Sequence, residues 1–340
     1  MRSIRIGIIG SGFIARTHAV SIKRYLKGAV LAGIAGGKRA TSLAAEFEVT
    51  NFPSVEQMAA DKDVDAVIIT SPHSFHFTHA MICAEAGKHA LVEKPMARTL
   101  AECETMERAF AARYLVLMVA FTQRYRETNR RAFELIHAGA IGRISMIQEF
   151  ALQPNALEAY PKWQQLPENL GVFFGYGIHN IDRLRWFLDA EAENVTAEIT
   201  KTPSGIEIST MAIIRWQNST ISSVWSSGDL KTPGFPATAF RSLVVGEKGM
   251  LDVDGYGALR LSVDSKPWET LFQQPPIDWR GEGMFAEARM GSFNAQNQEF
   301  VQSILEGRKP AITAEDGRKA VAIALAIYKS AEEHEVIQLK

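Results

Sequence analysis

The stretch GIIGSGFIA, residues 7–15, decides the fold class of this chain. It overlaps the end of a continuous apolar run, Ile4–Ile9, which is typical of a strand buried on both faces of a parallel sheet. Gly10–Ala15 then fits the pattern G-x-G-x-x-G/A at the start of a helix. In this pattern Gly10 permits a tight turn, Gly12 lets a pyrophosphate approach, and the helix N-terminus offers free N–H groups. The context favours a dinucleotide site; the alternative is a glycine-rich turn in another α/β fold.

Strand and helix signals alternate through the first third of the chain. This order predicts βαβ units and a doubly wound parallel sheet, the α/β architecture of a Rossmann domain. The expected strands are Ile4–Ile9, Val30–Ala35, Ala66–Thr70, Ala90–Glu93 and Leu115–Phe121. The expected helices are Thr17–Lys27, Ala40–Phe47, Ser74–Ala86 and Leu100–Ala112, with a short one that opens at Ser54.

The pattern changes after a further helix, Glu127–Ala138. Successive β-rich segments without intervening helices predict a second, α+β domain with a mostly antiparallel sheet. Two helices return late, at about 292–306 and 315–332. We expect a dinucleotide-binding domain of residues 1–123 and a second domain of residues 124–340. The expected strands are Ile144–Leu152, Val195–Lys201, Ile206–Trp216, Ser219–Ser226, Arg241–Gly246, Gly249–Val253 and Ala258–Ser262.

Composition narrows the function classes. The 340 residues carry a net charge of -1, so there is no basic excess for nucleic acid or an anionic membrane. Cys83 and Cys103 cannot make a disulfide framework, which favours reduced thiols. The opening MRSIRIGIIG does not fit a signal peptide, and the apolar run Ala320–Tyr328 is too short to span a membrane. We expect a cytoplasmic protein.

The end of the second strand bears on which dinucleotide is bound. An NAD site usually places an acidic residue there for the ribose 2′-hydroxyl. This chain instead reads Ala35-Gly36-Gly37-Lys38-Arg39, with no acidic residue before Glu46. Lys38 and Arg39 are suited to pairing with a 2′-phosphate. The pattern predicts a preference for NADP(H), with NAD(H) possible; the alternative is two solvated cations at a helix start.

Several motifs together resemble the Gfo/Idh/MocA oxidoreductases, a family named in part for glucose–fructose oxidoreductase and inositol dehydrogenase. They are the glycine turn, VDAVIITSPHSFHFTHAMICAEAGKHALVEKPMA (64–97), VAFTQRYRE (119–127), AIGRI (140–144) and the closing segment from FNAQNQEF onward. The resemblance implies a Rossmann domain and a larger open-sheet domain for substrate and oligomerisation. It also implies NAD(P)-dependent chemistry on sugars, cyclitols and related carbinols or carbonyls, and a homodimer or homotetramer.

Chemistry-bearing residues follow two of the expected strands. Ligands in doubly wound sheets bind beyond the carboxyl ends of strands, where Ser71-Pro72 and Glu93-Lys94-Pro95 lie. A partly desolvated ammonium such as that of Lys94 titrates nearer neutrality and can move a proton. Pro95 restricts Lys94 away from the helical region or makes a cis bond. By resemblance Lys94 is the catalytic lysine and Glu93 lies near the nicotinamide ribose; the alternative is a structural ion pair.

Of the histidines near this motif, only His76 matches a pattern of the family. His76 matches the histidine of the family's T-P-x-x-x-H pattern, which lines the cofactor side, but as a residue type it is equally a satisfied histidine at a helix start. His73, His79 and His89 are interpreted as surface or packing residues. No metal-ligand spacing such as H-E-x-x-H occurs, so we predict no metal. The predicted cofactor contacts are Gly10, Ser11, Gly12, Phe13, Ile14, Gly36, Lys38, Arg39, Ser71, Pro72, His76, Glu93 and Lys94.

A second constellation lies in LGVFFGYGIHNIDRLRWFLD, residues 170–189. It resembles a family segment in which an Asp precedes a His by four residues and a second Asp follows the His by three. Here His179 and Asp182 match and share a helix face, whereas Gly175 stands in place of the first Asp. His179 is the natural second proton-transfer group, since imidazole titrates near neutrality. The alternative is a helix-start histidine bonded to backbone.

The absent Asp leaves the orientation of the His179 ring open. Tyr176, Asn180 or Asp182 takes over this role, or the substrate supplies the polarity. In the loop 155–169, Tyr160 and Trp163 are suited to stacking on a sugar ring; the alternative is an Ω-loop packed by its own aromatics. Gln123, Arg124 and Tyr125 follow the last Rossmann strand. The predicted substrate contacts are Gln123, Arg124, Tyr160, Trp163, Tyr176, Asn180 and Asp182.

These residues predict an oxidoreductase that interconverts a carbinol and a carbonyl on a sugar-like molecule, with Lys94 and His179 handling the proton. A reductase of an imine or enone is a second hypothesis, favoured by Gly175. A cofactor-binding sensor on the same fold is a third. The intact Glu93-Lys94-Pro95 motif together with His179 favours catalysis over sensing.

Overall fold

The computed structural model describes residues 3–154, 161–166, 169, 171–230, 240–279 and 281–339. The chain divides into two compact units: Met1–Thr122 with Asp278–Lys319, and Gln123–Ile277 with Ala320–Lys340. The chain therefore leaves the first unit near residue 122 and returns to it at residue 278. The sequence analysis assigned residues 278–319 to the second domain, whereas their contacts place them with the first unit. Each unit is described by itself.

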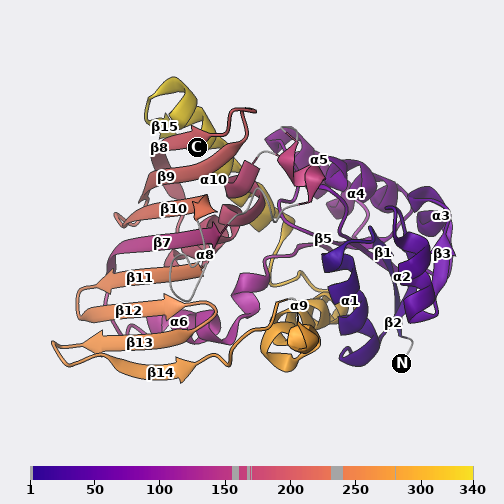
Figure 1. Ribbon diagram of the computed structural model, residues 1–340, viewed down its shortest axis with the longest axis horizontal. Helices are drawn as coiled ribbons and strands as arrows, with labels where there is room; N and C mark the ends of the chain where they lie inside the picture. Colours follow the sequence, from indigo (N-terminus) through magenta and orange to yellow (C-terminus); the bar gives the residue numbers. More distant parts are fainter. Residues whose placement is uncertain are drawn as a thin grey trace. The chain divides into compact units, whose positions relative to one another are not determined.

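The first unit is built on a six-stranded parallel sheet in the order β3-β2-β1-β4-β5-β6. Its central strands are apolar and buried on both faces, which is why they read as continuous hydrophobic runs. Figure 1 shows these strands with the helices that connect them. The strands are β1 (Ile4–Ile9), β2 (Ala29–Ala35), β3 (Thr50–Phe52), β4 (Ala66–Ile69), β5 (His89–Val92) and β6 (Leu117–Val119).

Side-chain capping fixes where two helices of the first unit begin. Ser54 accepts a hydrogen bond from Gln57 N at the start of α3, as the sequence predicts. Thr99 and Glu102 form a reciprocal capping box that opens α5. The helices of this unit are α1 (Phe13–Arg24), α2 (Ala40–Phe47), α3 (Val55–Ala60), α4 (His76–Glu85), α5 (Leu100–Ala111) and α9 (Glu287–Glu306), with short 3₁₀ turns at η1 (His73–Phe75) and η6 (Glu282–Phe285).

The second unit carries a nine-stranded sheet in the order β14-β13-β12-β11-β7-β10-β9-β8-β15. Its described pairs are antiparallel except β10 with β7, which run parallel. Figure 1 shows the strands side by side in one open sheet. They are β7 (Ile144–Pro154), β8 (Ala192–Lys201), β9 (Glu207–Trp216), β10 (Ile221–Leu230), β11 (Phe240–Gly246), β12 (Gly249–Asp254), β13 (Ala258–Val263), β14 (Glu269–Gln273) and β15 (Ile337–Gln338).

The two faces of this sheet differ. Helices α6 (Glu127–His137) and α8 (Ile178–Leu188) pack against its strands, and the side chains beneath them are buried. Along β9, buried residues alternate with exposed ones such as Met211 (55% exposed) and Ile213 (51%), the period-2 pattern of a strand with one open face. Helix α10 (Ala314–Glu333) begins in the first unit and ends in the second.

The predicted fold is confirmed: a parallel Rossmann sheet in the first third of the chain, then a large and mostly antiparallel sheet. Strands β3, β14 and β15 were not predicted, because β3 and β15 have only three and two residues and β14 lies in a segment without a clear pattern. In the part of the chain that the structure describes, no helix is both long and apolar enough to cross a membrane.

Candidate active site

The glycine turn after β1 has the geometry that a bound pyrophosphate requires. Gly10 has φ +112°, and a Cβ there would lie 2.6 Å from Thr70 Oγ1, so only glycine fits. Gly12 is the N-cap of α1 and offers no side-chain cap to the first-turn N–H groups. A Cβ on Gly12 would meet only the Arg39 guanidinium, at 3.9 Å. The open space and free helix N-terminus fit a dinucleotide phosphate.

The loop after β2 is tied to this turn. Ser11 is buried, and its Oγ accepts a hydrogen bond from Arg39 N at 3.1 Å. Gly36 and Gly37 both have positive φ, at +76° and +80°, and a Cβ on Gly37 would overlap Ser11 Oγ. The Ser11 side chain therefore holds the β2 loop against the glycine turn. Phe13 at the start of α1 is exposed, whereas Ile14 is half-buried.

The residues after β5 are positioned by backbone pairing to β4. Glu93 N donates to Ile69 O at 2.9 Å, so the strand pairing continues to the first residue of the motif. Lys94 is joined to Pro95 by a cis peptide bond, one of the two geometries that the sequence analysis considered. Burial lowers the pKa of Lys94, while the neighbouring Glu93 carboxylate acts to raise it. An ammonium at this position releases its proton more readily than an exposed lysine does.

His76 bridges the loops after β4 and β5. It is fully buried at the start of α4, with Nδ1 2.7 Å from Pro95 O and Nε2 2.9 Å from Ser71 O. Burial lowers the pKa of its imidazole, although both carbonyl contacts favour the protonated form. Ser71 is held from the other side by His79, whose Nδ1 lies 2.9 Å from Ser71 Oγ. His76 thus joins the loops after β4 and β5 from within the unit.

One contact in the first unit was not predicted. His18 on α1 is buried, with Nε2 3.2 Å from Glu93 Oε1 and Nδ1 3.0 Å from Asn297 Oδ1 on α9. His18 lies three residues after the glycine motif and Asn297 lies inside the closing segment, and the two are 279 residues apart. No sequence pattern links them. The histidine that was overlooked therefore touches the motif that was singled out.

In the second unit, His179 follows an irregular helical turn. Residues Phe173–Gly177 form a single π-helical turn, η5, which continues directly into α8. Gly177 lies so close to Phe173 that a Cβ would be 2.4 Å from its ring. His179 is buried one residue into α8, and its ring lies edge-on to Phe240 at 5.8 Å. Gly175 is also buried within this turn.

A buried carboxylate fixes the beginning of this turn. Glu207 on β9 accepts hydrogen bonds from Phe173 N at 2.7 Å and Thr210 Oγ1 at 2.9 Å. It also accepts one from the Tyr328 hydroxyl at 3.2 Å. Burial raises the pKa of Glu207, and these donors act against that rise. The segment that carries His179 is therefore attached to the sheet through a side chain as well as through its backbone.

Two predicted substrate residues bind each other. Both Asp182 carboxylate oxygens accept from Arg124, at 2.9 Å and 3.1 Å from Nε and at 2.6 Å from Nη2. Asp182 is fully buried. A bidentate pair of this kind is rigid and directional. Both oxygens of the Asp182 carboxylate therefore bind Arg124. This pairing weakens the hypothesis that Asp182 orients the His179 ring.

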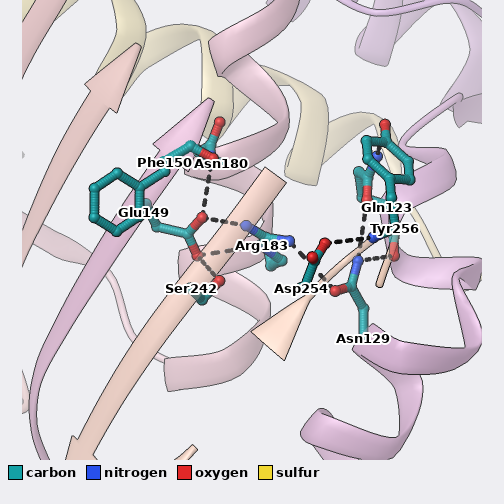
Figure 2. A network of polar contacts seen from close by, with 9 residues as sticks. All are labelled: Gln123, Asn129, Glu149, Phe150, Asn180, Arg183, Ser242, Asp254 and Tyr256. Atoms are coloured by element: carbon teal, nitrogen blue, oxygen red, sulfur yellow. Dashed lines mark hydrogen bonds and ion pairs between the residues drawn. The ribbon is translucent and has the colours of Figure 1, made fainter. Parts of the chain in front are cut away.

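Asn180 belongs to a buried polar network instead of an open surface. Glu149 on β7, fully buried, accepts from Asn180 Nδ2 at 2.6 Å, from Ser242 Oγ at 2.6 Å and from two nitrogens of Arg183. Figure 2 shows this carboxylate with its donors converging from α8 and β11. Arg183 reaches on to Asn129 Oδ1 at 3.3 Å. The network fixes the inner face of α8.

Gln123 lies at the far end of the same network. It is buried, accepts from Asn129 and donates from Nε2 to the Tyr256 hydroxyl at 2.7 Å, as Figure 2 shows. Burial raises the pKa of Tyr256, and Arg126 acts to lower it. Arg126 is itself buried, with its guanidinium carbon 5.1 Å from the Tyr256 ring centroid. Sequence reasoning missed both: Arg126 lies in the segment VAFTQRYRE but was not singled out there, and Tyr256 stands in no motif.

The structure describes two of the three aromatic residues predicted to contact substrate. Tyr176 is half-buried and packs on Phe240, with ring centroids 4.4 Å apart. Trp163 is half-buried in the 3₁₀ turn η3 (Lys162–Gln165), and its carbonyl accepts from Asn169 Nδ2. Tyr160 lies outside the described residues. Among the described residues, no group of three or more His, Cys, Asp or Glu side chains is arranged to hold a metal ion.

Comparison with known proteins identifies the family to which this chain belongs. A model of the oxidoreductase family with an NAD-binding Rossmann fold, Gfo/Idh/MocA, matches residues 4–121, and the model of the Gfo/Idh/MocA C-terminal domain matches residues 129–252. The chain belongs to the Gfo/Idh/MocA family. The predicted resemblance is confirmed, and the chain is an oxidoreductase with an NAD-binding domain.

Individual relatives are similar along their whole length. Inositol 2-dehydrogenase 3 from Saccharopolyspora erythraea is 26% identical, over 98% of this chain and 95% of the relative. The 1,5-anhydro-D-fructose reductase of Ensifer adhaerens is 28% identical, over 96% of both. Levoglucosan dehydrogenase, solved with NADH and L-sorbose, superposes with a TM-score of 0.88 over 100% of both chains at 24% identity. Scyllo-inositol dehydrogenase from Lactobacillus casei, solved with NAD(H) and scyllo-inositol, has a TM-score of 0.83 at 24% identity over 99% of both.

Proposed function

We propose that this oxidoreductase interconverts a secondary alcohol and a ketone on a sugar, cyclitol or related polyol, with a nicotinamide dinucleotide as the hydride carrier. The observation that carries the proposal is the lysine at the end of β5, whose pKa is lowered by burial. The glycine turn and the free N-terminus of α1 supply the phosphate site in the same unit. Relatives that act on inositols and anhydrosugars support the substrate class.

The protein residues have to hold the cofactor and move one proton. The bound nicotinamide supplies the hydride chemistry. In the oxidative direction the neutral amine of Lys94 accepts the proton of the substrate hydroxyl; in the reverse direction its ammonium donates that proton. Because burial lowers the pKa of Lys94, the amine is accessible nearer to neutral pH. His179 is the second proton-transfer group, on a helix start fixed by Glu207 and Glu149.

The decisive experiment is a spectrophotometric screen of sugars, cyclitols and ketosugars with each reduced and oxidised cofactor. On the best substrate, Lys94→Ala should lower kcat by about 10²–10⁴-fold, the usual contribution of a proton-transfer group. His179→Ala should lower it as well. The exposed Lys62 in the same unit gives a matched control, since Lys62→Ala should leave kcat unchanged. Undiminished turnover in Lys94→Ala refutes the mechanism, and tight cofactor binding without turnover on any substrate favours a sensor.

For cofactor choice we propose a preference for NADP(H). Lys38 and Arg39 are exposed beside the glycine turn, and Gly36 directly follows β2, where an NAD site usually has a carboxylate. The solved relatives named above carry NADH or NAD(H), so this preference would set the chain apart from them. Replacing both Lys38 and Arg39 by Ala should reduce kcat/KM for NADPH by more than about tenfold and spare NADH. A wild-type preference for NADH refutes this part of the proposal.

We also propose that the open face of the nine-stranded sheet binds a second copy of the chain. Exposed apolar side chains lie there on three adjacent strands: Met146 on β7, Met211 and Ile213 on β9, and Ile221 and Trp225 on β10. Contiguous exposed apolar residues of this kind mark association surfaces. Light scattering should give a dimer or tetramer for the wild type and a smaller species for the double variant with Ile213→Asp and Trp225→Asp. A monomeric wild type contradicts the proposal.

A further inference from the structure

A buried histidine contacts the carboxylate that precedes Lys94. The His18 side chain is 0% exposed, and its Nε2 lies 3.2 Å from Glu93 Oε1. On the other side of the ring, Nδ1 lies 3.0 Å from Oδ1 of Asn297. The three side chains form a continuous polar chain from α9 through α1 to the end of β5. All of them belong to the first unit.

The orientation of the Asn297 amide decides the hydrogen-bond roles. Both neighbours of the ring present acceptors, Asn297 Oδ1 and Glu93 Oε1, while Asn297 Nδ2 is buried without a partner among the described residues. The two ends of an amide are nearly identical in shape, so hydrogen bonding sets their assignment. With O and N exchanged, Nδ2 donates to His18 Nδ1, and His18 Nε2–H donates to the Glu93 carboxylate. Each ring nitrogen then has a hydrogen-bond partner, Nδ1 as acceptor and Nε2 as donor.

The Glu93 carboxylate needs such a restraint. Its side chain is only 12% exposed, and it carries three rotatable bonds next to the residue that moves the proton. A donor that is itself locked between two helices holds the carboxylate in one place at no further entropic cost. The edge of Phe293 lies against the His18 ring, with centroids 5.8 Å apart, and limits its rotation. The restraint thus comes from α9, which follows β14 of the second sheet in the chain.

We propose that His18 is a positioning residue that holds Glu93 in the orientation in which it contacts the cofactor, with Asn297 fixing the tautomer of His18. The inference rests on the proposed function, in which Glu93 lies at the nicotinamide ribose. His18 itself touches neither cofactor nor substrate in this account. It acts through Glu93 alone, and this separates it from a residue that only fills space between α1 and α9.

The test measures the Kd of cofactor binding to the full-length protein. Binding is monitored through the fluorescence of NADPH and of NADH. His18→Leu, which removes the donor, should raise Kd about tenfold, the loss expected for a hydrogen bond to a charged group. His18→Gln keeps an N–H at a similar distance and should stay within about threefold of the wild type. Val301→Ala is the matched control, because Val301 is fully buried on the same helix α9 but has no part in the restraint on His18; it should lower Tm and leave Kd unchanged.

A double-mutant cycle separates the inference from the proposed function. In a Glu93→Ala background, His18→Leu should raise Kd by less than about twofold, because the acceptor of the contact is already removed. In ¹⁵N-histidine-labelled protein, the Nε2–H signal of His18 should have a different chemical shift in Glu93→Gln than in the wild type. If Glu93→Gln changes neither Kd nor kcat, the proposed role of Glu93 fails. If Glu93→Gln weakens binding but a folded His18→Leu does not, or does so equally in both backgrounds, the positioning role is overturned.

Discussion

The buried Glu149–Arg183 pair offers the sharpest test of what holds α8, and with it His179, in place. Glu149 is 0% exposed and the Arg183 side chain 1%, so neither charge is solvated. Replacing Glu149 by Gln keeps the shape but leaves the guanidinium buried without its counter-charge. Breaking one partner of such a pair costs about 3–5 kcal/mol. Since a domain is stable by roughly 5–15 kcal/mol, this is a large part of the total.

The reasoning further predicts that the charge imbalance, rather than the loss of a contact, carries the cost. The double variant with Glu149→Met and Arg183→Met removes both charges and fills the space. It should lose less than Glu149→Gln alone, because replacing a buried ion pair by apolar residues is often neutral. The polar neighbours Asn180 and Ser242 lose a partner and should retain a cost of about 1 kcal/mol each.

Urea unfolding followed by tryptophan fluorescence provides the assay. Five of the six tryptophans lie in the second unit, and Trp216 is fully buried there with Nε1 bonded to Ser222 Oγ. The exposed pair Arg143–Glu247, with side chains 62% and 52% exposed, is the control; Arg143→Ala should cost at most about 0.5 kcal/mol. A loss below about 1 kcal/mol in Glu149→Gln, or a double variant no more stable than it, would refute the reasoning.

Three smaller predictions concern the first unit. Burial raises the pKa of the Cys83 and Cys103 thiols to about 12, so a thiol reagent at pH 8 should label neither until urea is added, and labelling of the native protein would contradict this. Burial lowers the pKa of His79 from 6.5 to about 4, so the unfolded chain binds the proton at a higher pH than the folded protein does. The free energy of unfolding should therefore fall by about 1 kcal/mol as the pH drops from 6.5 to 4, after allowance for the partial exposure of His79. His79→Gln should flatten that slope, measured by Tm against pH. Thr99→Ala removes the cap that pairs with Glu102 and should cost about 1 kcal/mol in chemical unfolding, whereas an equal loss in Thr99→Ser would show that the hydroxyl is not responsible.

The parts of the site that sequence reasoning located depend on local order. A strand that ends in Glu93-Lys94-Pro95 delivers those residues to the carboxyl edge of the sheet, whatever packs elsewhere. The partners of Gln123, Arg124 and Asn180 could not be foreseen in the same way. Each was predicted to contact substrate, and that stays a prediction; within the protein, Gln123 binds Tyr256, Arg124 binds Asp182 and Asn180 binds Glu149. Polar side chains of one type serve a ligand or a buried network equally well, and only their neighbours distinguish the two.

The sequence by itself determined the Rossmann unit, the glycine turn and the change to a mostly antiparallel second sheet. These features follow from short-range periodicity and from glycines that the backbone requires. Both signals can be recognised within a window of 10–15 residues. Tertiary structure alone decided that residues 278–319 return to the first unit, that β7 pairs in parallel with β10, and that Asn297 and His18 meet behind Glu93. These contacts join residues up to 279 positions apart. Their energies depend on burial and on matching donors with acceptors, which exist only once the chain has packed.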